Sequence, residues 1–239
     1  MGAMEFFEQQ WGSYRAIVDN DLMEHRALTA AVALAVDQWL AARPLGAPGP
    51  ELVDLGCGDL ALMAGHYRRW PLGGLLGLDL TAGVLPLAEQ ELGAVAYPCR
   101  FEQGDLLAWA NQVDGLPVDL IHTAFAVHHL NDEQKQTFLQ GCRRRLRPGG
   151  LLLWGDVFRE PGESRGEYVD RYKQRILSGW TVMTELQQQH TIAHLSSLDN
   201  PADRQLIESV AMEVGFESQW AWVGQHQAEK LLVLTYVCG

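Results

Sequence analysis

The spacing of apolar side chains divides the chain into a helical beginning and a longer, alternating part. Apolar residues recur every three or four positions over 5–42, which predicts helices with a break near Asp19-Asn20-Asp21. The polar side chains of that break are suited to capping the second helix. Proline and glycine then crowd 43–50, which predicts a linker. We therefore expect an N-terminal helical lid segment at 1–45 and a main domain at 46–239.

From residue 51 onward, short apolar runs alternate with helical patterns. Strands are predicted at 51–55, 74–79, 94–101, 118–124 and 151–156, and again at 218–223 and 230–237. The last two strands follow each other without a helix, which predicts an antiparallel hairpin at the end of the chain. The alternation before them favours a doubly wound sheet. The predicted fold class is therefore α/β, with a mostly parallel seven-stranded sheet, a C-terminal hairpin and a helical N-terminal lid.

One stretch, 159–199, interrupts the alternation and predicts a helical insert with helices near 163–177 and 182–195. Asn200-Pro201 then begins a further helix, because proline is favoured at the first helical position. Within the insert, Arg165, Tyr168 and Arg171 are spaced to share one helix face. This face is either solvated, with internal ion pairs, or a lid whose guanidinium groups bind an anionic substrate.

Composition narrows the possible partners. The chain has 239 residues, of which 47% are hydrophobic and 20% charged, as in a single soluble domain. Its formal net charge of −12 argues against nucleic acid as the main partner. We expect neither a leader peptide nor a membrane span, because no apolar run approaches about 20 residues. The four cysteines are scattered, without disulfide or metal-site spacing, which favours a cytoplasmic protein.

The residues with candidate chemistry follow the predicted strands. Asp54 lies at the end of the first strand, and Gly56 and Gly58 allow a ligand to contact the backbone because they lack a Cβ atom. Asp79 follows about twenty residues later, and a carboxylate accepts two hydrogen bonds from a vicinal diol. Asp105 follows the third strand, where it can accept from the amine of a base. Together these residues indicate a nucleoside-like ligand at the carboxyl ends of the strands.

Five segments of the chain resemble the motifs of class I S-adenosylmethionine-dependent methyltransferases, and they follow one another in the same order as those motifs. They are Leu52–Gly58, Asp79, Gly104–Leu106, Asp119–Leu130 and Leu146–Gly150, and Gly215-Phe216 resembles the start of that family's closing hairpin. The resemblance covers 51–237. It implies a Rossmann-like sheet, S-adenosyl-L-methionine as cofactor and direct methyl transfer to a small-molecule acceptor. The cofactor-binding residues it implies are Tyr14, Asp54, Gly56, Cys57, Gly58, Asp79, Leu80, Asp105, Leu106, Thr123, Ala124 and Phe125.

The turn departs from the family pattern at one position. Leu60 replaces the usual third glycine, and Asp59 precedes it. We expect the carboxylate end of the cofactor to be held differently from the usual arrangement, by Tyr14 or Arg15 of the N-terminal helix.

No catalytic residue follows from the pattern, and His128 and His129 are only weak candidates for a general base. In relatives, a histidine at the position of His129 commonly packs this loop. His190 and His194 are one helical turn apart, but without a third acidic or thiol ligand nearby we expect no metal. The side chains that we expect to contact the substrate are His25, Arg26, Arg165, Tyr168, Arg171 and Trp180.

Two other functions stay open at this point. A nicotinamide-dependent oxidoreductase uses the same kind of glycine turn, although Asp105 argues against it. A methyltransferase-like binding module without activity is the other alternative, and Leu60 is the residue in its favour.

Overall fold

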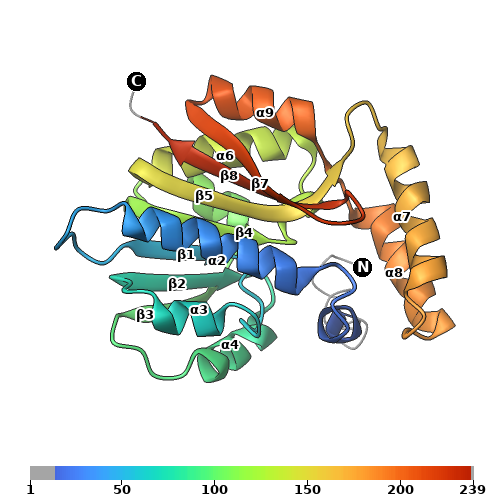
Figure 1. Ribbon diagram of the computed structural model, residues 1–239, viewed down its shortest axis with the longest axis horizontal. Helices are drawn as coiled ribbons and strands as arrows, with labels where there is room; N and C mark the ends of the chain where they lie inside the picture. Colours follow the sequence, from blue (N-terminus) through green and yellow to red (C-terminus); the bar gives the residue numbers. More distant parts are fainter. Residues whose placement is uncertain (1–13, 238–239) are drawn as a thin grey trace.

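A computed structural model describes residues 14–237, which form three layers with a sheet in the middle (Figure 1). The strands are β1 Glu51–Leu55, β2 Gly74–Asp79, β3 Cys99–Gln103, β4 Val118–Ala124, β5 Leu146–Arg159, β6 Ala202–Asp203, β7 Phe216–Val223 and β8 Glu229–Tyr236. Their order across the sheet is β3-β2-β1-β4-β5-β8-β7, and the two-residue β6 pairs with β5. The first five strands are parallel, whereas β8 is antiparallel to both neighbours. The predicted α/β fold with a C-terminal hairpin is confirmed.

Helices cover both faces of the sheet. They are α2 His25–Ala41, α3 Ala64–Arg69, α4 Leu85–Leu92, α5 Leu106–Asn111, α6 Asp132–Arg145, α7 Arg165–Gly179, α8 Glu185–Leu198 and α9 Arg204–Glu213, with 3-10 turns at Ala82–Val84 and Val127–His129. Residues 14–19 are also helical. The earlier part of the predicted N-terminal helix, and Cys238, lie outside the described residues.

The core consists of one cluster on each face of the sheet. Along β5, Leu152 and Trp154 pack with α5, α6 and α9, whereas Leu151 and Leu153 pack with α2, α3 and α4. Successive side chains of a strand point to opposite faces, so a strand covered on both sides consists almost entirely of apolar residues. The central position of β5 explains its continuous apolar run.

The N-terminal segment is divided between the core and one end of the sheet. Helix α2 buries Leu28, Val32 and Val36 against the sheet, so it is a structural layer. The predicted polar break lies just before it, and Asp21 Oδ1 accepts a hydrogen bond from the Arg26 amide at 2.9 Å. Residues 14–19 instead pack beside α7 and α8 at the end of the sheet (Figure 1).

The insert is the helical pair α7 and α8. Each helix begins with a capping box, at Ser164 with Glu167 and at Thr184 with Gln187. The two helices surround a third apolar cluster that includes Tyr168, Tyr172, Trp180 and Leu195. In the described part of the chain, no helix is long and apolar enough to cross a membrane.

Several predicted boundaries differ from the structure, and three of them have a structural cause. Strand β3 begins at Cys99 and not at residue 94, because residues 94–98 make no ladder with β2. Strand β5 begins at Leu146 and not at residue 151, and its register with β4 shifts between these two positions. The helix predicted at Asn200-Pro201 begins at Arg204, because Ala202 and Asp203 pair with β5 and the Asp203 side chain caps the Leu206 amide.

Candidate functional site

The turn after β1 is fixed against the end of β2. The amides of Gly56 and Cys57 donate to the Leu78 carbonyl oxygen at 2.7 and 3.0 Å. Asp79 Oδ2 accepts from the Gly58 amide at 2.9 Å and Oδ1 from the Thr81 amide at 2.8 Å. Burial raises the pKa of Asp79, and these backbone hydrogen bonds offset part of that rise. The carboxylate is therefore held in place beside the glycine turn.

The two glycines of the turn have a left-handed backbone, with φ of 77° at Gly56 and 55° at Gly58. A Cβ atom on Gly56 would lie 2.7 Å from the Ala126 Cβ atom. A Cβ atom on Gly58 would meet no atom within 4 Å, so it would extend into open space at the surface of the turn. Gly58 thus keeps space clear where a ligand would contact the backbone.

Leu60 also has a left-handed backbone, with φ of 58°. This conformation costs a residue with a side chain roughly 1–2 kcal/mol. The Leu60 side chain is only 3% exposed and packs with α2 and α3, and burial of a leucine contributes roughly 1.5–3 kcal/mol. The missing third glycine is therefore replaced by a residue that keeps the backbone shape and adds apolar packing.

A cavity of about 500 Å³ lies over the turn, at the carboxyl ends of the parallel strands; we call it the turn cavity. It lies where the strand order reverses between β1 and β4, the usual place for ligands in such sheets. Nine of the twelve residues expected to bind the cofactor line it: Tyr14, Gly56, Gly58, Asp79, Leu80, Asp105, Leu106, Ala124 and Phe125. Asp105 also caps α5, because its Oδ1 atom accepts from the Ala108 amide at 2.7 Å.

The three other residues of that set lie beside the turn cavity. Asp54 and Cys57 line an adjoining cavity under the turn, and Thr123 is fully buried and lines neither cavity. Asp54 Oδ2 accepts from the Tyr67 hydroxyl at 2.6 Å, and Oδ1 lies 2.9 Å from His122 Nδ1. Asp54 is 2% exposed, so this buried network supports the turn from below.

A second cavity, of about 110 Å³, lies between the end of β4, α7 and α8; we call it the histidine cavity. Tyr14, Phe125 and His129 line both cavities. Phe125 has a left-handed backbone, with φ of 51°, and its amide donates to the Gly155 carbonyl oxygen at 2.9 Å. Its ring lies 4.7 Å from that of His25. A strained aromatic residue thus forms the wall where the two cavities meet.

Comparison with known proteins gives the fold and points to a family. The sequence model of a methyltransferase domain family matches residues 52–150. The trans-aconitate 2-methyltransferase of Azoarcus sp. is 40% identical over 101 residues, which are 42% of this chain and 36% of that protein. Together these matches support the class I S-adenosylmethionine-dependent methyltransferase superfamily as the family of this chain, and they support S-adenosylmethionine as its cofactor.

Two further comparisons cover a larger share of the chain. A ubiquinone biosynthesis O-methyltransferase of Cereibacter sphaeroides is 28% identical over 185 residues, which are 74% of this chain and 70% of that protein. The structure of magnesium protoporphyrin IX methyltransferase from Synechocystis, with bound SAH, has a TM-score of 0.64 at 14% identity and covers 97% of both chains. The comparisons do not favour an oxidoreductase.

The trans-aconitate methyltransferases match over a limited region. The chain spans little more than a third of the length of the Azoarcus and Deinococcus radiodurans proteins, 36% and 37%.

The side chains expected to contact the substrate separate into two groups. His25, Tyr168 and Trp180 line the histidine cavity. Arg26, Arg165 and Arg171 do not line it. Arg171 pairs with Glu163 at 2.7 Å, and Arg165 donates to the Asp199 and Ser196 carbonyl oxygens at the end of α8. Arg26 donates to the Asp19 carbonyl oxygen. A role for these arginines in substrate binding stays a prediction, with no contact of the described residues in its favour.

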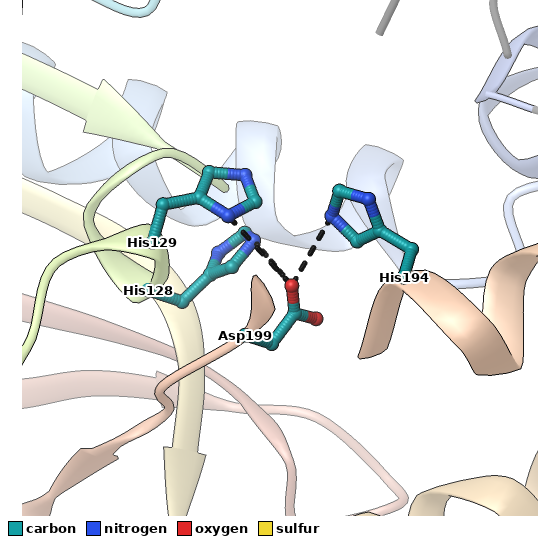
Figure 2. Close-up of side chains that lie close together, drawn as sticks. All are labelled: His128, His129, His194 and Asp199. Atoms are coloured by element: carbon teal, nitrogen blue, oxygen red, sulfur yellow. Dashed lines mark ion pairs between the residues drawn. The ribbon is translucent and has the colours of Figure 1, made fainter. Parts of the chain in front are cut away.

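His128 and His129 lie in the wall of the histidine cavity, together with His194 and Asp199 (Figure 2). His128 Nδ1 lies 2.6 Å from Asp156 Oδ1, and its backbone amide donates to Asp156 Oδ2 at 3.0 Å. Asp199 Oδ1 lies 3.7 Å from His128 Nε2, 3.7 Å from His129 Nδ1 and 3.2 Å from His194 Nε2.

The two neighbouring histidines differ in charge. Burial lowers the pKa of His128, but Asp156 and Asp199 more than offset this and raise it to about 9. Burial lowers the pKa of His129 to about 3, and the neighbouring His128 contributes to the shift. Asp199 has a pKa of about 2, because the three histidines outweigh the effect of its burial. In the absence of any ligand, a cationic His128 thus lies beside a neutral His129.

Sequence reasoning did not identify Asp156 and Asp199 as residues of the site. Asp156 interrupts the apolar run of β5 between Gly155 and Val157, and an acid within a buried strand was the signal that could have identified it. Asp199 lies five residues after His194, at the end of α8, where it appears as an ordinary cap. Only the fold brings either acid to the histidines.

Proposed function

We propose that this chain transfers a methyl group from S-adenosylmethionine to a small-molecule acceptor. The observation that carries the proposal is the meeting of the two cavities at Tyr14, Phe125 and His129. The turn cavity offers the volume and carboxylates that a nucleoside needs, and the histidine cavity offers a small, mostly aromatic space next to it. A donor in the first and an acceptor in the second would be adjacent.

The residues of the turn cavity fit the cofactor. Asp79 would accept hydrogen bonds from the ribose hydroxyls, and Asp105 from the adenine amine. Gly58 leaves open space for the methionine portion. Arg15, which pairs with Asp59 at 2.5 Å, and Tyr14 lie beside that portion of the turn and would help to hold the cofactor carboxylate.

The contribution of the protein to the reaction would be alignment and exclusion of water. When bound, S-adenosylmethionine supplies a methyl group on a sulfonium, whose C–S electron pair goes to sulfur as the acceptor's lone pair bonds to carbon. Phe125 would separate donor and acceptor except at the reacting atoms. His25, Tyr168 and Trp180 would surround the acceptor. Residues of the N-terminal segment and of the 159–199 insert would form the lid that closes the histidine cavity.

An anionic group on the acceptor stays a prediction from the sequence. None of the described residues that line the histidine cavity is a lysine or arginine, and the carboxylates of Asp156 and Asp199 already offset the charge of His128. The substrates named for the relatives are not assigned to this chain, because the Azoarcus and Deinococcus matches cover little more than a third of those proteins. A cytoplasmic location and the absence of a nucleic-acid partner stay predictions from composition.

Calorimetric titration of the full chain with S-adenosylmethionine and S-adenosylhomocysteine tests the proposal. Both ligands should bind at one site per chain, and Asp79→Asn should weaken binding at least about tenfold, since hydrogen bonds to a charged group contribute about 1.5–3 kcal/mol. Asp114→Asn, at an exposed loop position, is the matched control and should bind as the parent does. Absence of binding, or equal effects of the two variants, would contradict the proposal. Methyl transfer to any acceptor would exclude an inactive binding module.

A further inference from the structure

Four potential metal ligands converge on one wall of the histidine cavity (Figure 2). His128 and His129 lie in the turn after β4, His194 lies in α8, and Asp199 follows that helix. One ligand atom from each lies within 4.8 Å of the others. We propose that these residues bind a divalent transition-metal ion of the zinc type, because three imidazoles and one carboxylate are donors that Zn²⁺ prefers.

The distances suit a four-coordinate ion. Bonds of about 2.0–2.1 Å in a tetrahedron place ligand atoms about 3.3 Å apart. Asp199 Oδ1 lies 3.2 Å from His194 Nε2 and 3.7 Å from the nearest nitrogens of His128 and His129. Small side-chain rotations would therefore close the group around an ion. The expectation of no metal rested on the absence of a third ligand near His190 and His194 in the sequence, and the fold supplies the missing ligands from another element.

A second carboxylate orients one of the ligands. Asp156 Oδ1 lies 2.6 Å from His128 Nδ1, which leaves His128 Nε2 directed toward Asp199. Asp156 is itself held by the Trp154 indole nitrogen at 3.1 Å and the Val157 amide at 2.8 Å. Histidines that bind metal ions usually donate their other ring nitrogen to a carboxylate in this way, which fixes the tautomer. This buried Asp156–His128 pair is independent of the four converging atoms and points to the same ligand.

The position of the group suggests what the ion would do, and this part rests on the proposed methyl transfer. His129 lines both cavities, so the ion would lie beside the place where donor and acceptor meet. A zinc-type ion can expand to five ligands, so an acceptor hydroxyl or thiol would take the fifth position, where the ion lowers its pKa. The acceptor class that the site favours is therefore a small molecule with a hydroxyl or thiol, whose proton passes to solvent before methylation.

Metal binding is tested on the full chain without a histidine tag, after treatment with a chelator. Co²⁺ should bind at one ion per chain with visible absorption bands of low-symmetry nitrogen and oxygen coordination, and Zn²⁺ should displace it. His194→Gln and Asp199→Asn should each weaken binding at least about tenfold, and Asp156→Asn by roughly 10–100-fold. His190→Gln, one turn earlier on the exposed side of α8, is the matched control and should bind as the parent does.

Two results would overturn the site. One is the absence of stoichiometric binding of either ion, and the other is an equal loss of metal affinity in His190→Gln and His194→Gln. Far-UV circular dichroism and titration with S-adenosylhomocysteine establish that each variant is folded. The titration serves this purpose because none of the four substituted residues is assigned to the cofactor. Because the ion titrations need no acceptor and no cofactor, failure of methyl transfer would leave the metal result intact. Failure of metal binding would leave the cofactor titration intact.

Discussion

Arg15 Nη1 lies 2.5 Å from Asp59 Oδ2 and joins the N-terminal helical segment to the glycine turn. The pair connects residues 44 positions apart in the sequence. It lies where this turn departs from the family pattern, one residue before Leu60. The pair thus couples the N-terminal helical segment to the glycine turn that we propose contacts the cofactor.

Loss of this pair should weaken cofactor binding. Arg15→Gln and Asp59→Asn should each raise the dissociation constant for S-adenosylhomocysteine by up to about fivefold, since a partly exposed ion pair contributes at most about 1 kcal/mol. The double variant should bind S-adenosylhomocysteine no more weakly than the single variant with the larger loss of affinity, because both changes remove the same interaction. Arg26→Gln, an exposed arginine of the same segment, is the control for calorimetry. Additive effects in the double variant would show that the two residues act separately.

The left-handed backbone at Leu60 predicts an unusual order of stabilities. Leu60→Gly removes more of the side chain than Leu60→Ala does. We nevertheless expect the glycine variant to be more stable than the alanine variant by about 1 kcal/mol, because only glycine adopts φ of 58° without strain. Both variants should be less stable than the parent, since each loses the buried leucine. Urea unfolding measures all three free energies. An alanine variant as stable as the glycine variant would contradict the assignment of strain.

The network under the turn should contribute to stability. Tyr67→Phe removes the hydroxyl that donates to Asp54 at 2.6 Å, which leaves a buried carboxylate oxygen without that donor. The free energy of unfolding should therefore fall by about 1–3 kcal/mol. Tyr97→Phe is the matched control, because the Tyr97 hydroxyl donates to the Tyr67 carbonyl oxygen in a partly exposed position. Its cost should be about 1 kcal/mol or less. Equal losses in urea unfolding would assign no special role to Asp54.

His25 should make the fold sensitive to acid. Burial lowers its pKa to about 4, partly offset by Asp21, whereas the unfolded chain keeps a value near 6.5. Between these values the unfolded chain binds a proton that the folded chain does not, so stability falls as pH falls from 6.5 to 4. The loss attributable to His25 should reach about 3 kcal/mol.

The His25→Gln variant isolates this contribution. Other groups titrate in the same range, so the quantity to compare is the difference in unfolding free energy between parent and variant, measured at pH 7 and pH 4.5. The variant should lose less stability than the parent over this interval. A parallel decline of the two proteins would show that His25 is not buried in its neutral form.

The arginines of the insert show why side-chain partners are hard to predict from spacing. Residues 165, 168 and 171 do lie on one helix, but the face they share is not uniform. Tyr168 points into the apolar cluster, whereas Arg171 forms an ion pair with Glu163. Arg165 binds carbonyl oxygens at the end of the next helix. Helical periodicity places residues on a face, but which neighbour meets that face depends on how two helices pack.

Local patterns in the sequence specify the order of strands and helices, the glycine turn, the acid that ends β2 and the acid that follows β3. These are local: alternation of apolar side chains, glycine at positive φ and carboxylates at strand ends all depend on neighbours within a few residues. Nine residues of the turn cavity could be named from the sequence, most of them through the resemblance to the methyltransferase motifs. Even Leu60 was recognisable as a departure, although its left-handed backbone and buried side chain were not.

Which distant side chains meet depends on how the whole chain packs. Helix α2 belongs to the core because the sheet needs apolar cover on that face. Ala202 and Asp203 form a strand because β5 offers them a partner. His128 and His129 reach Asp199 because α7 and α8 fold back over the end of β4. The contacts of His128 and His129 with Asp199 join residues about seventy positions apart, and no local pattern encodes a distance that only the packing of the whole chain sets.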